Sequence, residues 1–296
     1  MTLHAHGSFN VDEAESAIVW RYVGLSALLH LLAKKTLYFP LLASLEDPWE
    51  GSPGMPDLLA FAEGSGLEGN ERLEAVQTFQ KRFARRRSRL AASCWYRSER
   101  ESAAMWTPYA ERGRGIAIRS TVGRLAAALD EGRELTIGAV EYVDHLTTTL
   151  GEEDLRCAFA KNAAYAHENE VRVVTSVSDD EWSAMKDRKG VAGPRWYFVE
   201  GAGDGPNIAQ VSVQAFGDGP TDGVYVVADT SSLIDRVVVA PGAEPWVVEA
   251  VQASVSALEH DLPVVRSSLG TVPLHRPVRG RLLIFPGETK QGDDVP

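Results

Sequence analysis

Two glutamates and an arginine alternate in the segment Glu168-Asn169-Glu170-Val171-Arg172. Alternate residues of an extended strand share a face, so we expect Glu168, Glu170 and Arg172 to project together. Two carboxylates held close together have pKa values that separate, which suits one of them as a base or an electrostatic stabiliser. The same pattern also fits the solvated face of an edge strand. Glu168 and Glu170 are therefore the candidate catalytic residues, and the solvated face of an edge strand remains the alternative.

A second candidate is Arg21, which stands between Trp20 and Tyr22 in an apolar segment. The guanidinium group of arginine is a rigid fork that matches a phosphate or a carboxylate. The alternative interpretation is an ordinary surface arginine between two packed aromatic residues.

Aromatic residues recur in the middle of the chain, in Ser93-Cys94-Trp95, Met105-Trp106 and Tyr109. Such rings can stack on a nucleobase or a nicotinamide ring, and they can equally belong to the core. Cys94 would need a nearby base to act as a nucleophile, and no local signature selects one.

Six basic residues fall between positions 81 and 89 of a chain whose net charge is -11. The acidic total argues against a protein that coats nucleic acid through its overall field. A local acidic substrate could still bind the predicted helix over 71–90 through Arg85, Arg86 and Arg87. A solvated helix face explains the same residues.

Several common enzyme classes are excluded because their motifs are missing. The chain contains no Walker loop, no G-x-G-x-x-G and no G-x-S-x-G. His167 precedes Glu170 by three residues, but no second histidine completes a zinc signature, so we expect no metal site.

The elements that must position these residues alternate irregularly along the 296-residue chain. Runs of β-branched and aromatic residues predict strands over 18–23, 37–39, 115–118, 140–143 and 171–174, among others. Helical spacing predicts helices over 71–90, 152–166 and 244–259. Without a regular βαβ alternation, the expected class is α+β, with a mixed, mostly antiparallel sheet and flanking helices.

The whole pattern fits one compact domain over 17–286, with a flexible lead-in over 1–16 and a polar tail over 287–296. Two cysteines suit a reducing compartment, and no apolar run reaches the ~18 residues of a membrane helix. We therefore expect a cytoplasmic protein without a membrane partner. The oligomeric state is left open.

The order of the motifs resembles a widespread bacterial family described only as a domain of unknown function, number twenty-nine seventy-one. The resemblance runs from Ile18 to Leu269 and rests on the following segments: Trp20–Tyr22, Leu37–Phe39, Asp47–Gly51, Ser93–Trp95, Met105–Trp106 with Tyr109, Gly115–Ile118, Glu168–Arg172, Val237–Ala243 and Val265–Leu269.

The layout is also similar, more distantly, to ADP-ribosyltransferase folds, including the branch that modifies DNA. That resemblance implies NAD as a substrate. It implies that Arg21, with Tyr22 beside it, holds a phosphate or ribose of NAD, and that Ser93 lies near the nicotinamide with Trp95 or Tyr109. Glu170 would stabilise the positive charge that develops as nicotinamide leaves. The middle motif lacks the family's Ser-Thr-Ser pattern.

Three hypotheses follow. The first is an ADP-ribosyltransferase or NAD hydrolase that acts on a nucleic acid or protein in stress or phage defence; it requires Arg21, Ser93 and Glu170 to line one cleft. The second is a metal-dependent nuclease in which Asp47 or Glu50 joins the Glu168–Arg172 segment. The third is a non-catalytic module that binds a partner through exposed aromatic residues.

Overall fold

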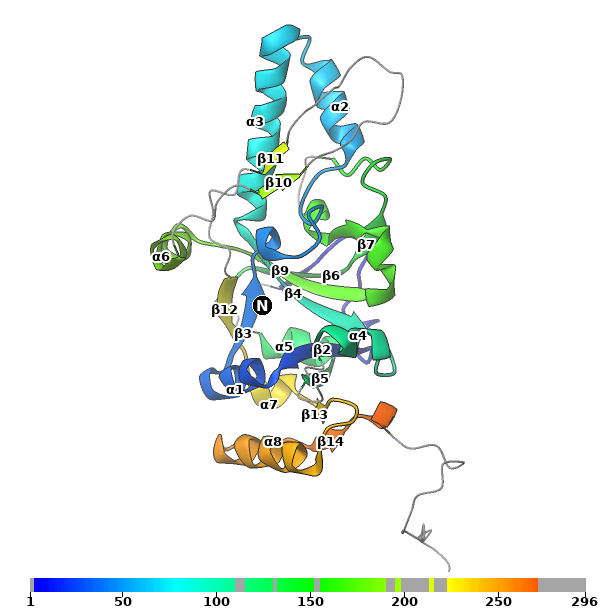
Figure 1. Ribbon diagram of the computed structural model, residues 1–296, viewed down its shortest axis with the longest axis vertical. Coiled ribbons are helices and arrows are strands. Elements are labelled where there is room, and N and C mark those ends of the chain that lie inside the picture. The colour runs from blue at the N-terminus through cyan, green and yellow to red at the C-terminus, as the bar shows by residue number, and fades with distance from the viewer. Residues whose placement is uncertain are drawn as a thin grey trace, which may run out of the picture.

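The computed structural model of the protein describes residues 3–109, 115–129, 132–151, 155–189, 195–197, 213–215 and 223–270. An eight-stranded sheet forms its centre (Figure 1). The strands lie in the following order across the sheet: β1 (Leu3–Ala5), β6 (Leu135–Ala139), β9 (Glu170–Ser176), β4 (Leu90–Arg97), β2 (Ile18–Gly24), β5 (Gly115–Thr121), β13 (Arg236–Val239) and β14 (Val264–Arg266). The outermost pairs, β1 with β6 and β13 with β14, are parallel, and the inner pairs are antiparallel. The expected α+β class with a mixed, mostly antiparallel sheet is confirmed.

Three two-stranded sheets lie around this centre. They are β3 (Thr36–Pro40) with β12 (Gly223–Val227), β7 (Glu141–Val143) with β8 (Ala160–Asn162), and β10 (Arg195–Tyr197) with β11 (Val213–Ala215). The helices are α1 (Leu25–Lys34), α2 (Met55–Gly64), α3 (Gly69–Arg87), α4 (Ala103–Tyr109), α5 (Val122–Ala128), α6 (Asp179–Lys189), α7 (Thr230–Leu233) and α8 (Pro245–Ala257). Short 3-10 turns occur at η1 (Leu42–Ser44), η2 (Arg156–Phe159), η3 (Ala163–Glu168) and η4 (Ser268–Gly270). Within the described ranges, no helix is long and apolar enough to cross a membrane.

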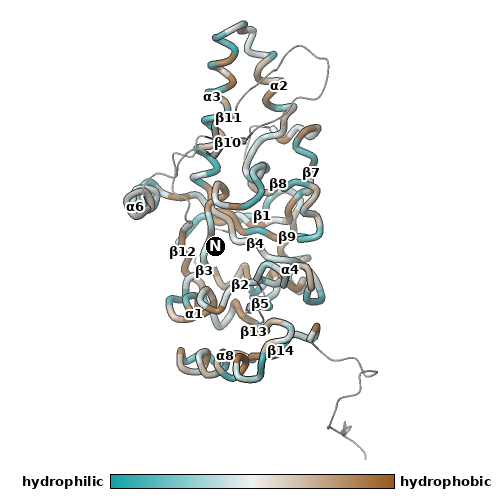
Figure 2. The backbone as a smooth tube through the Cα atoms, in the orientation of Figure 1, coloured by the Kyte–Doolittle hydropathy of each residue, from teal (hydrophilic) through white to brown (hydrophobic). Residues whose placement is uncertain are grey.

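The main core lies on one face of the sheet. Inward-facing residues such as Ile116, Val173 and Val237 pack there against Leu28 of α1 and Val251 of α8, and all five are essentially inaccessible to solvent. Figure 2 shows hydrophobic residues along the central strands and alternating hydropathy along α3, which stands with α2 as a hairpin away from the sheet. The apolar face of α3 is used within that hairpin, where Phe79 packs against Phe61 of α2 at 4.7 Å between ring centroids.

The sheet opens between β2 and β4. The two strands pair at Val19 with Arg97 and at Trp20 with Tyr96, near the end of β4. At the other end of β4, Ala91 forms an isolated bridge with Leu41, which follows β3. The middle of β4, which contains Ser93 and Trp95, therefore borders an opening between two neighbouring strands.

The predicted helix over 152–166 is wrong over its described part. That stretch forms η2, the strand β8 and η3. The Asn162 side chain accepts a hydrogen bond from the backbone N–H of Ala164, an N-cap arrangement that starts η3 and ends the strand. β8 gains its backbone partners from β7, a pairing that local spacing does not reveal.

The structure describes three of the remaining sequence-based expectations and leaves a fourth outside its range. The segment expected as a flexible lead-in contributes β1, which pairs with β6 over residues 3–5 and extends the sheet. The expected helices over 71–90 and 244–259 are confirmed as α3 and α8. The polar tail over 287–296 lies outside the described residues.

We expect Gly54→Ala to lower the free energy of unfolding by about 3 kcal/mol, because the new methyl group overpacks a backbone contact. A Cβ atom built on Gly54 would lie 1.9 Å from the carbonyl oxygen of Thr148. Urea denaturation measures the change. Gly64→Ala is the control, since a Cβ there meets nothing within 4 Å. Equal stabilities of the two variants would contradict this account of the contact.

Candidate active site

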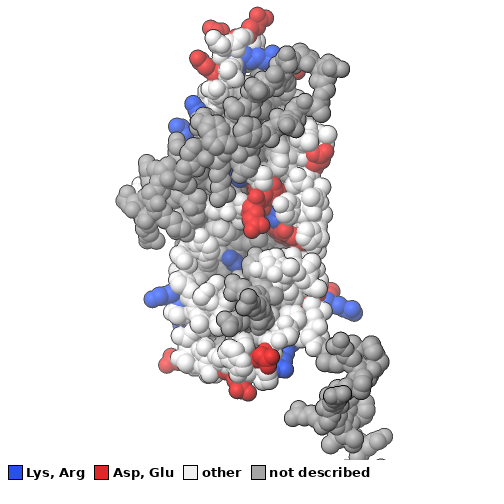
Figure 3. Space-filling view, in the orientation of Figure 1, with Lys and Arg blue, Asp and Glu red and all other residues white. Residues whose placement is uncertain are grey.

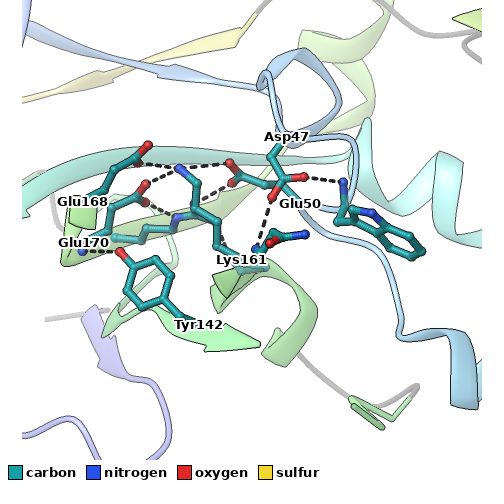
Figure 4. A network of polar contacts seen from close by, with 10 residues as sticks. Asp47, Glu50, Tyr142, Lys161, Glu168 and Glu170 are labelled. Atoms are coloured by element: carbon teal, nitrogen blue, oxygen red, sulfur yellow. Dashed lines mark hydrogen bonds and ion pairs between the residues drawn. The ribbon is translucent and has the colours of Figure 1, made fainter. Parts of the chain in front are cut away.

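Six charged residues from separate parts of the chain meet on one face of β9 (Figure 4). They are Asp47 and Glu50 from the loop before α2, Lys161 of β8, Glu168 at the end of η3, and Glu170 and Arg172 of β9. We call this group the charged cluster. On the face of the molecule in Figure 3, acidic side chains gather near the middle with basic ones among them.

Arg172 is the buried centre of the charged cluster, with no exposed surface. Its Nε donates to Glu170 at 2.7 Å, and its Nη2 lies 2.5 Å from Oε2 of Glu50. Its Nη1 donates to the backbone carbonyl of Ala158 at 2.9 Å. One guanidinium group therefore ties the Glu50 loop, β9 and η2 together.

Lys161 is the second cation of the cluster. Its Nζ lies 2.6 Å from Glu170, 2.5 Å from Glu168 and 3.4 Å from Glu50. Burial opposes the charged form, but the negative charges of Glu170 and Glu50 outweigh it and raise the pKa of Lys161. Lys161 therefore stays protonated at every physiological pH.

The cluster carries more negative than positive charge. The cluster contains two cations and four carboxyl groups, so its net charge is −2 when all six are ionised. Asp47 is matched by backbone groups, because its oxygens accept the N–H groups of Trp49 and Asn162 at 3.0 and 3.2 Å. Glu168 is left as the outermost carboxyl, and 20% of its side chain is exposed against 4% for Glu170.

The two alternating glutamates have widely different proton affinities. Burial, together with a hydrogen bond shared with Glu170, raises the pKa of Glu168 to about 7. Burial also acts on Glu170, but Arg172, Glu168 and Lys161 overcome it and hold the pKa of Glu170 well below its usual range. Glu168 can therefore exchange a proton near neutral pH while Glu170 remains a fixed negative charge.

Two neighbours complete the cluster. The backbone N–H of Glu170 donates to the Tyr142 hydroxyl at 2.8 Å, and burial raises the pKa of Tyr142 to about 12, so the phenol stays protonated. Cys94 lies on the same face of the sheet, opposite Arg172 in register. Burial and then the negative charge of Glu170 raise the pKa of its thiol, so Cys94 is a poor nucleophile.

A second group of polar residues occupies the opening between β2 and β4. Arg21 donates one hydrogen bond to the Ser93 hydroxyl and another, of 2.6 Å, to the backbone carbonyl of Tyr38. The indole N–H of Trp95 donates to the same Ser93 oxygen at 2.9 Å, and the Arg21 guanidinium carbon lies 5.8 Å from the Trp95 ring centroid. The structure thus brings together Arg21, Ser93 and Trp95, three residues that the sequence singled out separately.

The expectation that Glu170 joins Arg21 and Ser93 on one face is wrong. In the antiparallel pair of β4 and β9, Ser93 lies opposite Val173, whereas Tyr96 lies opposite Glu170. Residues opposite each other share a face and neighbours along a strand alternate, so Ser93 and Glu170 project to opposite faces of the sheet. Glu170 is held by Lys161 and Arg172 instead.

Two of the aromatic candidates, Tyr22 and Trp95, also differ from expectation, and a third lies outside what the structure describes. Tyr22 belongs to a second core, where its ring meets Trp106 edge-on at 4.9 Å and its hydroxyl accepts the N–H of Ser102. Trp95 has no exposed surface, so it supports Arg21 rather than offering its ring to a ligand. Tyr109 ends α4, and its side chain lies outside the described residues.

The basic residues predicted to bind substrate lie at the C-terminal end of α3. Arg85 is exposed, and Arg86 and Arg87 are half-buried. A Cβ built on Gly51 would lie 3.0 Å from Cγ of Arg87, so Arg87 packs against the loop that carries Glu50. This end of α3 therefore borders the charged cluster.

The donors expected for a metal-dependent nuclease are already engaged within the protein: Asp47 accepts backbone N–H groups, and the glutamates pair with cations. The ammonium group of Lys161 lies among Glu50, Glu168 and Glu170, where a metal ion would have to bind. Among the residues that the structure describes, no three His, Cys, Asp or Glu side chains are grouped to hold a metal ion.

Sequence reasoning missed Lys161 and Tyr142, and it considered Glu50 only as a metal ligand. Lys161 fell within the helix expected over 152–166, and a lysine on a helix is usually solvated, so nothing in the sequence marked it as a site residue. The signal that could have found Glu50 is its place in Asp47-Pro48-Trp49-Glu50-Gly51, a turn that contains two acids and a large ring.

Comparison with known proteins gives little to set beside this geometry. No family model matches the chain, and no curated protein matches it in sequence. One solved structure is similar, DarT from Thermus sp. 2.9 in complex with carba-NAD+, with 11% identity over 86% of this chain and 97% of that chain. Its TM-score is 0.28, so the likeness shows neither a family nor a function. The chemistry of the site rests on this chain's own residues.

We expect Arg172→Met to destabilise the protein by about 3–5 kcal/mol, because it leaves the carboxylates of Glu50 and Glu170 buried with one cation fewer. Thermal and urea unfolding measure the loss. Arg236→Met is the matched control: 45% of the Arg236 side chain is exposed, and its ion pair with Asp235 should contribute at most about 1 kcal/mol. Similar losses in both variants would contradict the central role of Arg172.

The raised pKa of Glu168 makes stability depend on pH. The folded state holds this proton more tightly than the unfolded chain, whose carboxyl has the ordinary pKa of 4.5. The contribution is therefore complete below pH 4.5 and is lost as pH rises to about 7. Glu168→Gln removes the titration, so the melting temperature of the wild type should fall relative to this variant across that window.

Glu249→Gln, on the exposed side of α8, is the control for the pH series. Its melting temperature should follow that of the wild type throughout. A constant difference between wild type and Glu168→Gln from pH 4.5 to 7 would show that Glu168 does not hold a proton in the folded state.

Proposed function

We propose that the protein is an ADP-ribosyltransferase-like enzyme that uses NAD and cleaves the bond between nicotinamide and ribose. The observation that carries this proposal is the pair Glu168 and Glu170, two carboxyl groups that bind one ammonium group, that of Lys161. Burial and Glu170 raise the pKa of Glu168, whereas Arg172, Glu168 and Lys161 hold that of Glu170 below its usual range. Breaking an N-glycosidic bond develops positive charge on the sugar, as in other glycosyl transfers. A site with surplus negative charge stabilises that transition state.

Within this proposal, the roles of the two glutamates differ from those that the family resemblance implied. Glu168 is the carboxyl with exposed surface, so it contacts the ribose and stabilises its developing charge in the ionised form. Glu170 is a positioning residue, which acts through Lys161 because one ammonium group binds both carboxylates. The order of the motifs along the chain, which resembles ADP-ribosyltransferase folds, supports the same reaction class.

The proposal does not use the expected NAD contacts of Arg21 and Ser93. Arg21 bonds to Ser93, which projects to the face of the sheet opposite Glu170, so the expected single cleft lined by Arg21, Ser93 and Glu170 is absent and the proposal rests on the charged cluster. The acceptor is proposed to be a nucleic acid or a protein, drawn to the exposed end of α3 at Arg85, or water in an NAD hydrolase. A role in bacterial stress or phage defence suits an enzyme that consumes NAD.

Incubation of the purified protein with NAD tests the proposal through the release of nicotinamide, with and without oligonucleotide and protein acceptors. We expect Glu168→Gln to lower the rate by about 100-fold or more, the usual effect of removing a group that stabilises transition-state charge. Glu249→Gln should leave the rate unchanged. Because the ionised form is the active one, kcat/KM should rise with pH through about 7 and then level off. No nicotinamide release and no NAD binding by the folded wild type would refute the proposal.

A further inference from the structure

Three aromatic side chains meet at the surface where α1, β3 and β12 come together. The Tyr225 ring of β12 lies 5.1 Å from that of Tyr38 on β3 and 4.7 Å from that of His30 on α1, measured between centroids. We call these three residues the aromatic platform. None of them belongs to the charged cluster.

Two residues of the aromatic platform are open to solvent, and the third, Tyr38, is half-buried. Tyr225 is 48% exposed, and His30 is also exposed. Tyr38 alternates on β3 with the buried residues Leu37 and Phe39, so it projects away from the core together with its cross-strand partner Tyr225. Exposed rings in contact with one another present π-faces on which a planar ring can stack, an interaction worth about 1–3 kcal/mol for a nucleobase.

Positive charge flanks the platform in a protein that is otherwise acidic. Lys34 follows His30 by four residues, so the two side chains share one face of α1. Lys35 comes next, and its carbonyl oxygen accepts the N–H of Ala228, just after β12, at 2.9 Å. Both lysines are exposed. In Figure 3, basic side chains project from the edge of the molecule where Figure 1 places α1.

The rings of the aromatic platform can stack on a planar base, and the nearby lysines can bind a phosphate attached to it. A planar base on Tyr225 leaves an attached phosphate free to reach the lysines at the end of α1. Since the net charge of the chain is -11, this local arrangement rather than the overall field must supply the attraction. The platform also adjoins the opening described above, because the backbone carbonyl of Tyr38 accepts a hydrogen bond from Arg21.

We propose that the aromatic platform and Lys34 form a binding site for a free nucleotide, with the base stacked on Tyr225 and the phosphate at Lys34. This site uses neither Glu168 nor Glu170 and stands whether or not the protein turns over NAD.

Calorimetric titration with adenosine monophosphate tests the site. We expect Tyr225→Ala to weaken binding at least fivefold, corresponding to the lower limit of about 1 kcal/mol for stacking, and Tyr225→Phe to retain it. Lys34→Gln should weaken the binding of adenosine monophosphate but not that of adenosine. Trp246→Ala is the control, because Trp246 is an exposed ring (57%) on α8, outside the platform. Melting curves establish that each variant is folded.

The proposal is overturned if adenosine monophosphate does not bind, or if Tyr225→Ala binds it as tightly as Trp246→Ala does. A single-stranded oligonucleotide that binds only when Tyr225 is present, while adenosine monophosphate does not bind, would assign the platform to a nucleic acid and also overturn it. An effect of Lys34→Gln on adenosine would overturn the placement of the phosphate. None of these readouts requires the release of nicotinamide, so their outcome is separate from that of the NAD assay.

Discussion

A guanidinium group without access to water must be matched by negative charge inside the protein, and Arg172 imposes this constraint on the structure. The cost of desolvating an isolated ion is several kcal/mol, so removing its partners would be far more unfavourable than keeping them. Glu50 and Glu170 therefore have to converge on Arg172, although 120 residues separate them (170 − 50). The path of the loop before α2 follows from that requirement.

The same loop is secured at several further points, which makes the charged cluster rigid. Asp47 binds the backbone of Asn162, and the N–H of Gly51 donates to Cys157 at 3.1 Å. Asp57 accepts the N–H groups of Gly54, Leu150 and Gly151, all within 2.9 Å. Because the surrounding contacts hold Glu168 and Glu170 close together, both carboxyl groups do not ionise equally easily, and their pKa values differ. The exposed member, Glu168, therefore keeps a proton near neutral pH while the buried member does not.

Much of the fold could be predicted from local patterns. The α+β class, the strands over 18–23, 115–118 and 171–174, and helices α3 and α8 follow from hydrophobic periodicity and β-branched content. The structure of the segment over 155–166 could not be predicted in this way. Its alanines favour a helix, whereas the ion pairs of Lys161 and the pairing of β8 with β7 come from residues elsewhere in the chain. Tertiary contacts outweigh the weak intrinsic preference for helix there.

By itself, the sequence determined which residue types were available for chemistry: the alternating glutamates, Arg21 with its aromatic neighbours, and Ser93 with Trp95. Only the tertiary structure decided which of these work together. Side chains alternate with a period of two, so the pairing of β4 with β9 places Glu170 and Ser93 on opposite faces of the sheet. The pairing register depends on contacts between distant strands, and so does the burial that assigns proton exchange to Glu168 and fixed charge to Glu170.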